Sequence, residues 1–113
     1  MIAIVDYGVG NLFSLSSSVK SLGAEVRVTR DAADLRAADH ILLPGVGAFA
    51  DAMAKLEATG LVPVLHEETQ KKPLLGICLG MQLLFEESYE YGAHRGLGLI
   101  PGAVCPLADD LRD

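Results

Sequence analysis

The sequence has no long hydrophobic run and little positive charge. No apolar stretch approaches the ~20 residues that a membrane-spanning helix needs, and the N-terminus lacks the basic and apolar regions of a signal peptide. We therefore expect a cytoplasmic protein with no membrane partner. The net charge is −6 and no basic block occurs, which argues against nucleic acid or an anionic membrane as a partner.

Cysteine is also scarce. The two cysteines, Cys78 and Cys105, stand in unlike contexts, so a disulfide framework is not indicated and metal-ligand spacing is absent. We expect no metal and no cofactor. The length of 113 residues is that of one domain, and half of the residues are hydrophobic.

Short apolar segments alternate with helical patterns along the chain. Strands are predicted at 2–5, 26–28, 41–43 and 74–77. Helices are predicted at 12–22, 31–38, 49–56 and 61–69, with a last one after the fourth strand through roughly Glu87. Residues 92–102 are expected to form a loop. This alternation predicts an α/β fold with a mostly parallel sheet and helices on both faces, and such sheets bind ligands at the carboxyl ends of their strands.

Glycine-rich turns follow two of the predicted strands. Gly8-Val9-Gly10 would begin a dinucleotide-binding fingerprint, but the third glycine position is Phe13. The segment 45–50 fits G-x-G-x-x-A, yet the acidic residue at the required distance, Glu67, lies inside a predicted helix. We favour tight turns over nucleotide sites. At Pro44–Gly47 the glycines would expose main-chain N–H groups that can form part of an oxyanion hole.

Gly76-Ile77-Cys78-Leu79-Gly80 places a thiol between two glycines at a strand-to-helix junction. This is the cysteine form of the G-x-S-x-G nucleophile elbow. The N-terminus of the following helix favours the thiolate, and the N–H of Leu79 would face a developing oxyanion. The pattern alone leaves open a buried structural cysteine, the usual state of a free cysteine. Cys105 lacks these neighbours and is expected to be structural.

Four motifs together resemble the class I (triad-type) glutamine amidotransferases. They are DYGVGN at 6–11, LLPGVG at 42–47, GICLGMQLLFEES at 76–88 and GLGLIPG at 96–102. PGVG combined with GMQ is most similar to the glutaminase subunit of imidazole glycerol phosphate synthase. The resemblance implies a flavodoxin-like α/β domain that hydrolyses glutamine to glutamate and ammonia through a cysteine thioester. It also implies a partner, a (β/α)8-barrel cyclase subunit that receives the ammonia in histidine biosynthesis.

The resemblance further implies a role for seven residues of this chain. They are Cys78 as the nucleophile, Val46, Gly47 and Leu79 in the oxyanion hole, and Gly45, Gln82 and Glu90 as contacts to the glutamine substrate. Glu90 would bind the substrate amino group, but Tyr89 and Tyr91 interrupt the acidic run at this point. A solvated surface charge is the alternative for Glu90.

A base for the cysteine is missing from the pattern. A cysteine nucleophile needs a proton acceptor within hydrogen-bond reach, and the resemblance implies a histidine in an H-P-E segment, which does not occur here. His66 has H-x-E spacing, but residues i and i+2 of a helix do not share a face, so we expect it on the surface. His40 begins a strand at the end away from the site, and His94 lies in a predicted loop. We therefore expect residues 1–113 to be the N-terminal part of a single, truncated amidotransferase domain.

Three interpretations follow from the sequence. The first is a glutaminase subunit or its N-terminal half, and the second is a catalytically incomplete fragment that folds, self-associates or docks on a cyclase. The third is the glutaminase component of another amidotransferase or a different cysteine-elbow protein, such as a thiol hydrolase or a redox-responsive protein. That last alternative would not require Pro44–Gly47 and Gln82 together. Half a domain would leave a sheet face and a strand edge uncovered, so we expect self-association if the chain folds alone.

Overall fold

Four short strands form a parallel sheet in a computed structural model that describes residues 1–107. The strands are β1 (Ile2–Val5), β2 (Val26–Thr29), β3 (His40–Leu43) and β4 (Leu74–Gly76). Their order in the sheet is β2-β1-β3-β4, and each neighbouring pair is parallel. The predicted strands and the predicted parallel sheet are confirmed.

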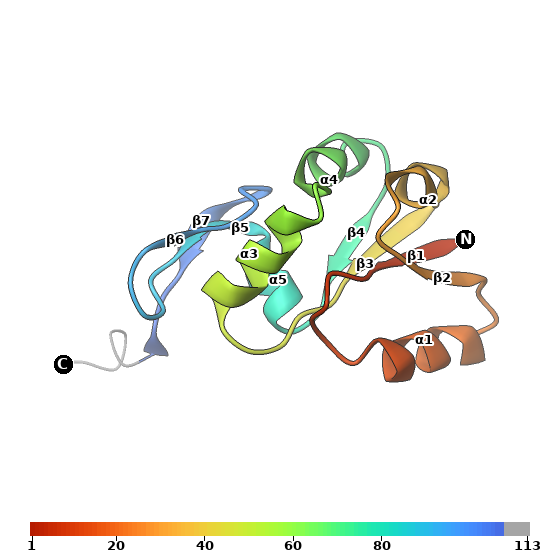
Figure 1. Cartoon of the computed structure of the whole chain (residues 1–113), viewed down its shortest axis with the longest axis horizontal. Helices are drawn as coiled ribbons and strands as arrows, with labels where there is room; N and C mark the ends of the chain where they lie inside the picture. The colour runs from red at the N-terminus through yellow and green to blue at the C-terminus, as the bar shows by residue number, and fades with distance from the viewer. Residues whose placement is uncertain (108–113) are drawn as a thin grey trace.

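Helices connect successive strands and lie on both faces of the sheet, as Figure 1 shows. They are α1 (Leu12–Ser21), α2 (Ala32–Ala37), α3 (Phe49–Ala58) and α4 (Val62–Glu68). Two of them begin at a polar residue that caps their free N–H groups. The side chain of Asn11 accepts a hydrogen bond from the Ser14 N–H at 3.1 Å, and that of Asp31 accepts one from the Ala33 N–H at 2.9 Å. The DYGVGN turn therefore ends in the cap of α1.

The hydrophobic core lies between the sheet and helices α2, α3 and α4. Alternate residues of a strand point to one face, and Val5, Ile41 and Leu43 are fully buried on the face that these helices cover. Leu56 of α3 and Leu65 of α4 are fully buried against them. Helix α1 differs, because it has no buried residue and contacts mainly β2. One face of the sheet is therefore thickly covered and the other thinly.

Helix α5 is shorter than the sequence predicted. It spans Leu79–Leu83 and does not reach Glu87, because β5 (Phe85–Ser88) follows directly. The Leu84 carbonyl oxygen accepts hydrogen bonds from the backbone N–H groups of residues 99–100, at 2.8 and 2.9 Å. These bonds replace the intrahelical bonds that would continue the helix. The prediction of a longer helix was wrong because a distant segment of the chain caps α5.

A second sheet forms where a loop was predicted. Its order is β6-β5-β7, with β6 (His94–Arg95) antiparallel and β7 (Ile100–Val104) parallel to β5. Gly96 fits beneath the Phe85 carbonyl oxygen, which would lie 2.3 Å from a Cβ at that position. The GLGLIPG segment thus joins the end of α5 to this second sheet, which lies at the far end of the molecule from β2 (Figure 1).

An apolar surface lies on the thinly covered face of the first sheet. Leu75 of β4 is 59% exposed, and a cavity of about 370 Å³ runs beside it along Ile2 and Leu42. Within residues 1–107, β4 pairs with β3 on one side and has an open edge on the other. None of the helices in this part of the chain is long and apolar enough to cross a membrane.

A buried carboxylate ties α4 to α2. The side chain of Glu68 is 3% exposed and lies 3.0 Å from the Lys72 ammonium, with Lys71 and Arg36 at 3.6 and 3.4 Å. Lys72 also donates to the carbonyl oxygens of Leu35 and Arg36 at the end of α2, at 2.8 and 2.9 Å. The hydrogen bond from Lys72, helped by the nearby positive charges, outweighs burial and lowers the pKa of Glu68 below its ordinary value.

We expect the 113-residue chain by itself to self-associate through the surface around Leu75. Burial of exposed apolar side chains drives association, and an open strand edge offers unpaired backbone groups. Leu75→Lys should shift the light-scattering mass toward a monomer, because a charge would have to be buried in the contact. Leu22→Lys, at a residue that is 85% exposed at the end of α1, is the matched control and should leave the mass unchanged. A wild-type chain that stays monomeric would refute this expectation.

The Glu68 cluster predicts a specific loss of stability in acid. Because folding lowers the pKa of Glu68, its ionised form stabilises the fold above the ordinary pKa of 4.5, and this contribution disappears as the pH falls through the lower folded-state pKa. Glu68→Gln should therefore reduce the free energy of unfolding at neutral pH, and the difference from wild type should close in acid. Urea denaturation across a pH series measures this, with Glu57→Gln, at an exposed position of α3, as the control. A difference that does not depend on pH would show that the carboxylate charge is not the cause.

Candidate active site

The predicted elbow has the strand–turn–helix geometry that its glycines suggested. Cys78 lies between β4 and α5 with φ 56° and ψ −126°, a backbone conformation that residues other than glycine rarely adopt. A Cβ at Gly80 would lie 1.9 Å from the Leu43 carbonyl oxygen, and one at Gly76 would lie 2.6 Å from the Met81 Cα. Both glycines are therefore needed for the chain to turn this sharply against β3.

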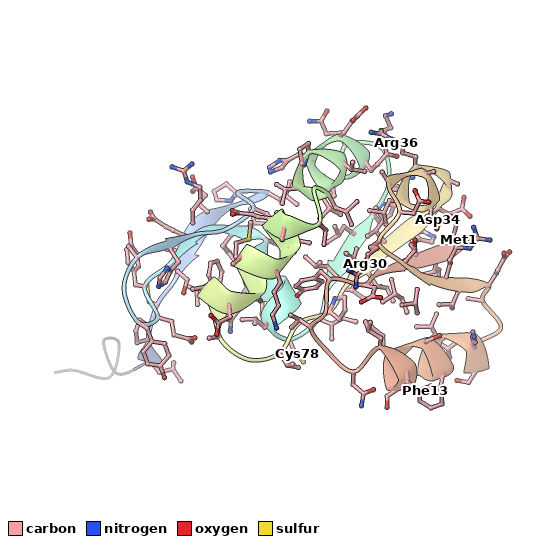
Figure 2. The ribbon with its side chains drawn as sticks, in the orientation of Figure 1. Met1, Phe13, Arg30, Asp34, Arg36 and Cys78 are labelled. Atoms are coloured by element: carbon pink, nitrogen blue, oxygen red, sulfur yellow. The ribbon has the colours of Figure 1, made fainter. Side chains whose placement is uncertain are left out.

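The thiol of Cys78 is exposed. In Figure 2 it lies at the lower margin of the molecule, near the start of α5. The alternative of a buried structural cysteine is therefore wrong for this residue. Cys105 is also exposed, so burial does not support the structural role that was predicted for it.

A cavity of about 180 Å³ opens beside Cys78. It is lined by Gly10, Asn11, Leu15, Pro44, Gly45, Val46, Ile77 and Cys78. Three segments meet here because the carboxyl ends of β1, β3 and β4 share one edge of the parallel sheet. The structure thus brings together Cys78, Gly45 and Val46 of the predicted site.

Asn11 and Leu15 line the cavity but were absent from the predicted site. The DYGVGN motif had been recognised, but its residues were interpreted only as a turn. The available signal was topological, because a segment that follows β1 must reach the same edge as the elbow. Gly10 packs here as well, since a Cβ at this position would lie 3.3 Å from the Pro44 Cβ.

The turn at Pro44–Gly47 packs directly on the elbow through Gly45. A Cβ at Gly45 would lie 2.7 Å from the Gly80 nitrogen. The Leu79 N–H donates a hydrogen bond to the Gly45 carbonyl oxygen at 3.1 Å. Because a trans peptide directs its C=O and N–H oppositely, the Val46 N–H of the same peptide unit points away from Leu79. The N–H groups of Val46 and Leu79, two of the three predicted oxyanion residues, therefore do not converge in this arrangement, and their role would require this peptide to rotate.

Gln82 and Glu90 lie outside the lining of this cavity. Gln82 is on α5, and its side-chain oxygen is buried without a hydrogen-bond partner within the described part of the chain. An unpaired buried acceptor is costly. Glu90 follows β5, where its backbone N–H donates to the Ser88 hydroxyl at 3.2 Å. Gly47 follows Val46 in the turn and is exposed, with φ 92°.

The three histidines lie away from the cavity. His40 is the first residue of β3, at the opposite end of that strand from Pro44, and it lines the cavity beside Leu75. This confirms the place predicted for it. His66 is partly exposed on α4. His94 belongs to β6 rather than to a loop, and its Nε2 lies 3.0 Å from the Tyr91 carbonyl oxygen. Within residues 1–107, then, no histidine lines the Cys78 cavity.

Comparison with known proteins finds one matching family and several similar proteins. The family of class-I glutamine amidotransferases matches residues 3–96. The imidazole glycerol phosphate synthase subunit HisH of Exiguobacterium sibiricum is 57% identical over 99% of this chain and 57% of that protein. The subunit of the same name from Aquifex aeolicus is 53% identical over 92% of this chain and 51% of that protein. The chain thus spans little more than half the length of these curated relatives.

A solved structure shares the fold. A crystal structure of a glutamine amidotransferase superposes with a TM-score of 0.77 at 20% identity, over 93% of this chain and 56% of that chain. At this identity the similarity concerns the fold alone. It agrees with the predicted α/β fold of class I glutamine amidotransferases.

The conformation of Cys78 predicts an unusual pair of stabilities. A side chain at such a positive φ destabilises the fold by roughly 1–3 kcal/mol, and glycine avoids this strain. The greater freedom of glycine in the unfolded chain destabilises the fold by roughly 0.4–1 kcal/mol and so offsets part of that gain. Cys78→Gly should therefore be more stable to urea than Cys78→Ala by about 1 kcal/mol. The control pair is wild type and Ala54→Gly on the exposed side of α3, where glycine should be less stable by about 1 kcal/mol. Equal stability of the two Cys78 variants would mean that this backbone position carries no strain.

Proposed function

The chain belongs to the glutamine amidotransferase class-I family, and from this premise we propose that residues 1–113 are the N-terminal part of a glutaminase domain. The proposed domain is that of the glutaminase subunit of imidazole glycerol phosphate synthase. The observation that carries the proposal is the exposed Cys78 on its elbow, facing a cavity that the turn at Pro44–Gly47 closes on the other side. A thiol presented in this way is accessible to a small substrate.

The proposed reaction uses Cys78 as the nucleophile. Its thiolate attacks the carboxamide carbon of glutamine, the C–N bond breaks, and the nitrogen leaves as ammonia after gaining a proton. Water then hydrolyses the resulting thioester to glutamate and restores the thiol. Main-chain N–H groups of Val46, Gly47 and Leu79 would stabilise the oxyanion once the Gly45–Val46 peptide unit rotates and its carbonyl oxygen leaves the Leu79 N–H.

Three further residues are proposed to hold the substrate. Gly45 brings the turn against the elbow, and its small size keeps that approach open. The buried side-chain oxygen of Gln82 is an acceptor free for a substrate N–H donor within the described part of the chain. Glu90, in the turn after β5, is proposed to pair with the substrate amino group.

The proposed partner is a (β/α)8-barrel cyclase subunit that receives the ammonia in histidine biosynthesis. Relatives at up to 57% identity that are named as subunits of imidazole glycerol phosphate synthase support this proposal. A cytoplasmic location is proposed with it.

One observation favours a second candidate for the 113-residue chain by itself. None of its three histidines lines the Cys78 cavity, and a cysteine nucleophile needs a base within hydrogen-bond reach. The chain alone would then bind glutamine at Cys78 without hydrolysing it, and would act as a folding or docking unit. The two candidates share a nucleophile and differ in the release of ammonia.

We expect a diazo-ketone analogue of glutamine to label Cys78 and spare Cys105. Both thiols are exposed, so a small generic alkylating agent should modify both, while only Cys78 faces the cavity. Intact mass and peptide mapping measure the adducts, and excess glutamine should suppress the one on Cys78. Cys78→Ala should abolish the adduct, and Cys105→Ala should retain it.

Two results would reject glutamine recognition by this chain. One is equal labelling of both cysteines by the glutamine analogue, and the other is an unlabelled Cys78 that still reacts with the generic agent. Labelling of Cys78 without ammonia release would instead select the second candidate, a site that recognises glutamine but lacks its base.

A further inference from the structure

Hydrogen bonds to the carbonyl oxygens of two successive residues hold the turn beside Cys78. The carbonyl oxygen of Gly45 accepts the Leu79 N–H at 3.1 Å. The carbonyl oxygen of the preceding residue, Pro44, accepts a hydrogen bond from the Tyr7 hydroxyl at 2.5 Å. One contact comes from the elbow and the other from the segment that follows β1. The turn is therefore held from both sides.

Tyr7 is built into this position. Its side chain is 3% exposed and belongs to the hydrophobic core. Its hydroxyl lies where a Cβ of Gly45 would be 2.8 Å away, so the absence of a side chain at Gly45 makes room for it. Burial raises the pKa of Tyr7 to about 12, which keeps the hydroxyl protonated and able to donate at any physiological pH.

The Pro44 carbonyl needs such a donor. Pro44 is buried, and a buried carbonyl oxygen without a hydrogen bond is destabilising. Its oxygen also determines the orientation of the peptide unit that leads into Gly45. If that unit turned, the next carbonyl oxygen would move away from the Leu79 N–H. The hydroxyl of Tyr7 thus acts on the elbow through the turn, without lining the cavity itself.

We propose that Tyr7 is a positioning residue for the candidate active site. Its hydroxyl holds the Pro44 carbonyl and so keeps the Gly45 carbonyl on the Leu79 N–H, the arrangement of the turn in which the Val46 N–H faces away from Leu79. The inference rests on the proposed function for its meaning in the reaction. The restraint that the Tyr7 hydroxyl places on the turn is a property of the chain itself, and it can be measured without glutaminase activity.

Amide hydrogen exchange of Leu79 tests the restraint, because the Leu79 N–H reports directly on the place of the Gly45 carbonyl. Tyr7→Phe should accelerate exchange at Leu79 by about tenfold, as expected for loss of one buried hydrogen bond. Exchange at Ile41 and Leu65, whose N–H groups bond to Pro73 and Leu61, should remain as in wild type. Tyr91→Phe, at a residue that is 88% exposed, removes the same hydroxyl group elsewhere and should change none of the three.

Two results of this comparison would overturn the proposal. Unchanged exchange at Leu79 in Tyr7→Phe would show that the hydroxyl does not restrain the turn. Equal acceleration at Leu79, Ile41 and Leu65 would show that Tyr7 is only a core residue whose loss weakens the whole fold.

Wild-type protein provides a second measurement that does not depend on how the variant folds. The hydroxyl proton of Tyr7 should give its own NMR resonance, protected from solvent, with a nuclear Overhauser effect to the Gly45 Hα that occupies the Cβ position 2.8 Å from the hydroxyl oxygen. A hydroxyl proton in fast exchange with water would overturn the proposal. Labelling of Cys78 by the glutamine analogue is judged separately, so its failure rejects the proposed function, whereas failure at Leu79 or at the hydroxyl rejects the role of Tyr7.

Discussion

The candidate site depends on the close approach of two backbones, at Gly45 and at Gly80. A Cβ at Gly80 would meet the Leu43 carbonyl oxygen at 1.9 Å, and a Cβ at Gly45 would meet the Gly80 nitrogen at 2.7 Å. Backbone atoms cannot move aside as the tip of a flexible side chain can. Because α5 packs this tightly on the end of β3, the residue between strand and helix has little choice of conformation, and Cys78 takes a positive φ that presents its thiol outward.

The close contact between Gly45 and Gly80 also explains where the main-chain N–H groups point. With Gly45 against the elbow, its carbonyl oxygen lies within reach of the Leu79 N–H, and the two form a hydrogen bond. This bond satisfies a donor at the start of α5 that would otherwise be free. It also places the Val46 N–H on the opposite side of the same peptide plane. The packing that exposes the nucleophile therefore also keeps the N–H groups of Val46 and Leu79 apart.

The sequence was sufficient for features set by local pattern and insufficient for those set by distant pairing. The spacing of Phe49, Met53 and Leu56 predicted α3, and all three side chains are buried. The glycines around Cys78 predicted the elbow, because only small residues allow that turn. The end of α5 was missed because the segment before Glu87 has helical character. In the structure, residues 99–100 instead donate hydrogen bonds to the Leu84 carbonyl oxygen, and β7 pairs with β5.

Distance along the sheet limits which residue can act as a base for Cys78. His40 begins β3 and Pro44 follows its end, so their Cα atoms are four residue steps apart, or about 13 Å at the usual rise. His66 lies near the end of α4, which leads into the start of β4 and so toward the same far edge. His94 is held in the second sheet by the Tyr91 carbonyl. A parallel sheet cannot bring its amino edge to its carboxyl edge without unfolding. A glutaminase built around Cys78 must therefore draw its proton acceptor from a residue other than these three histidines.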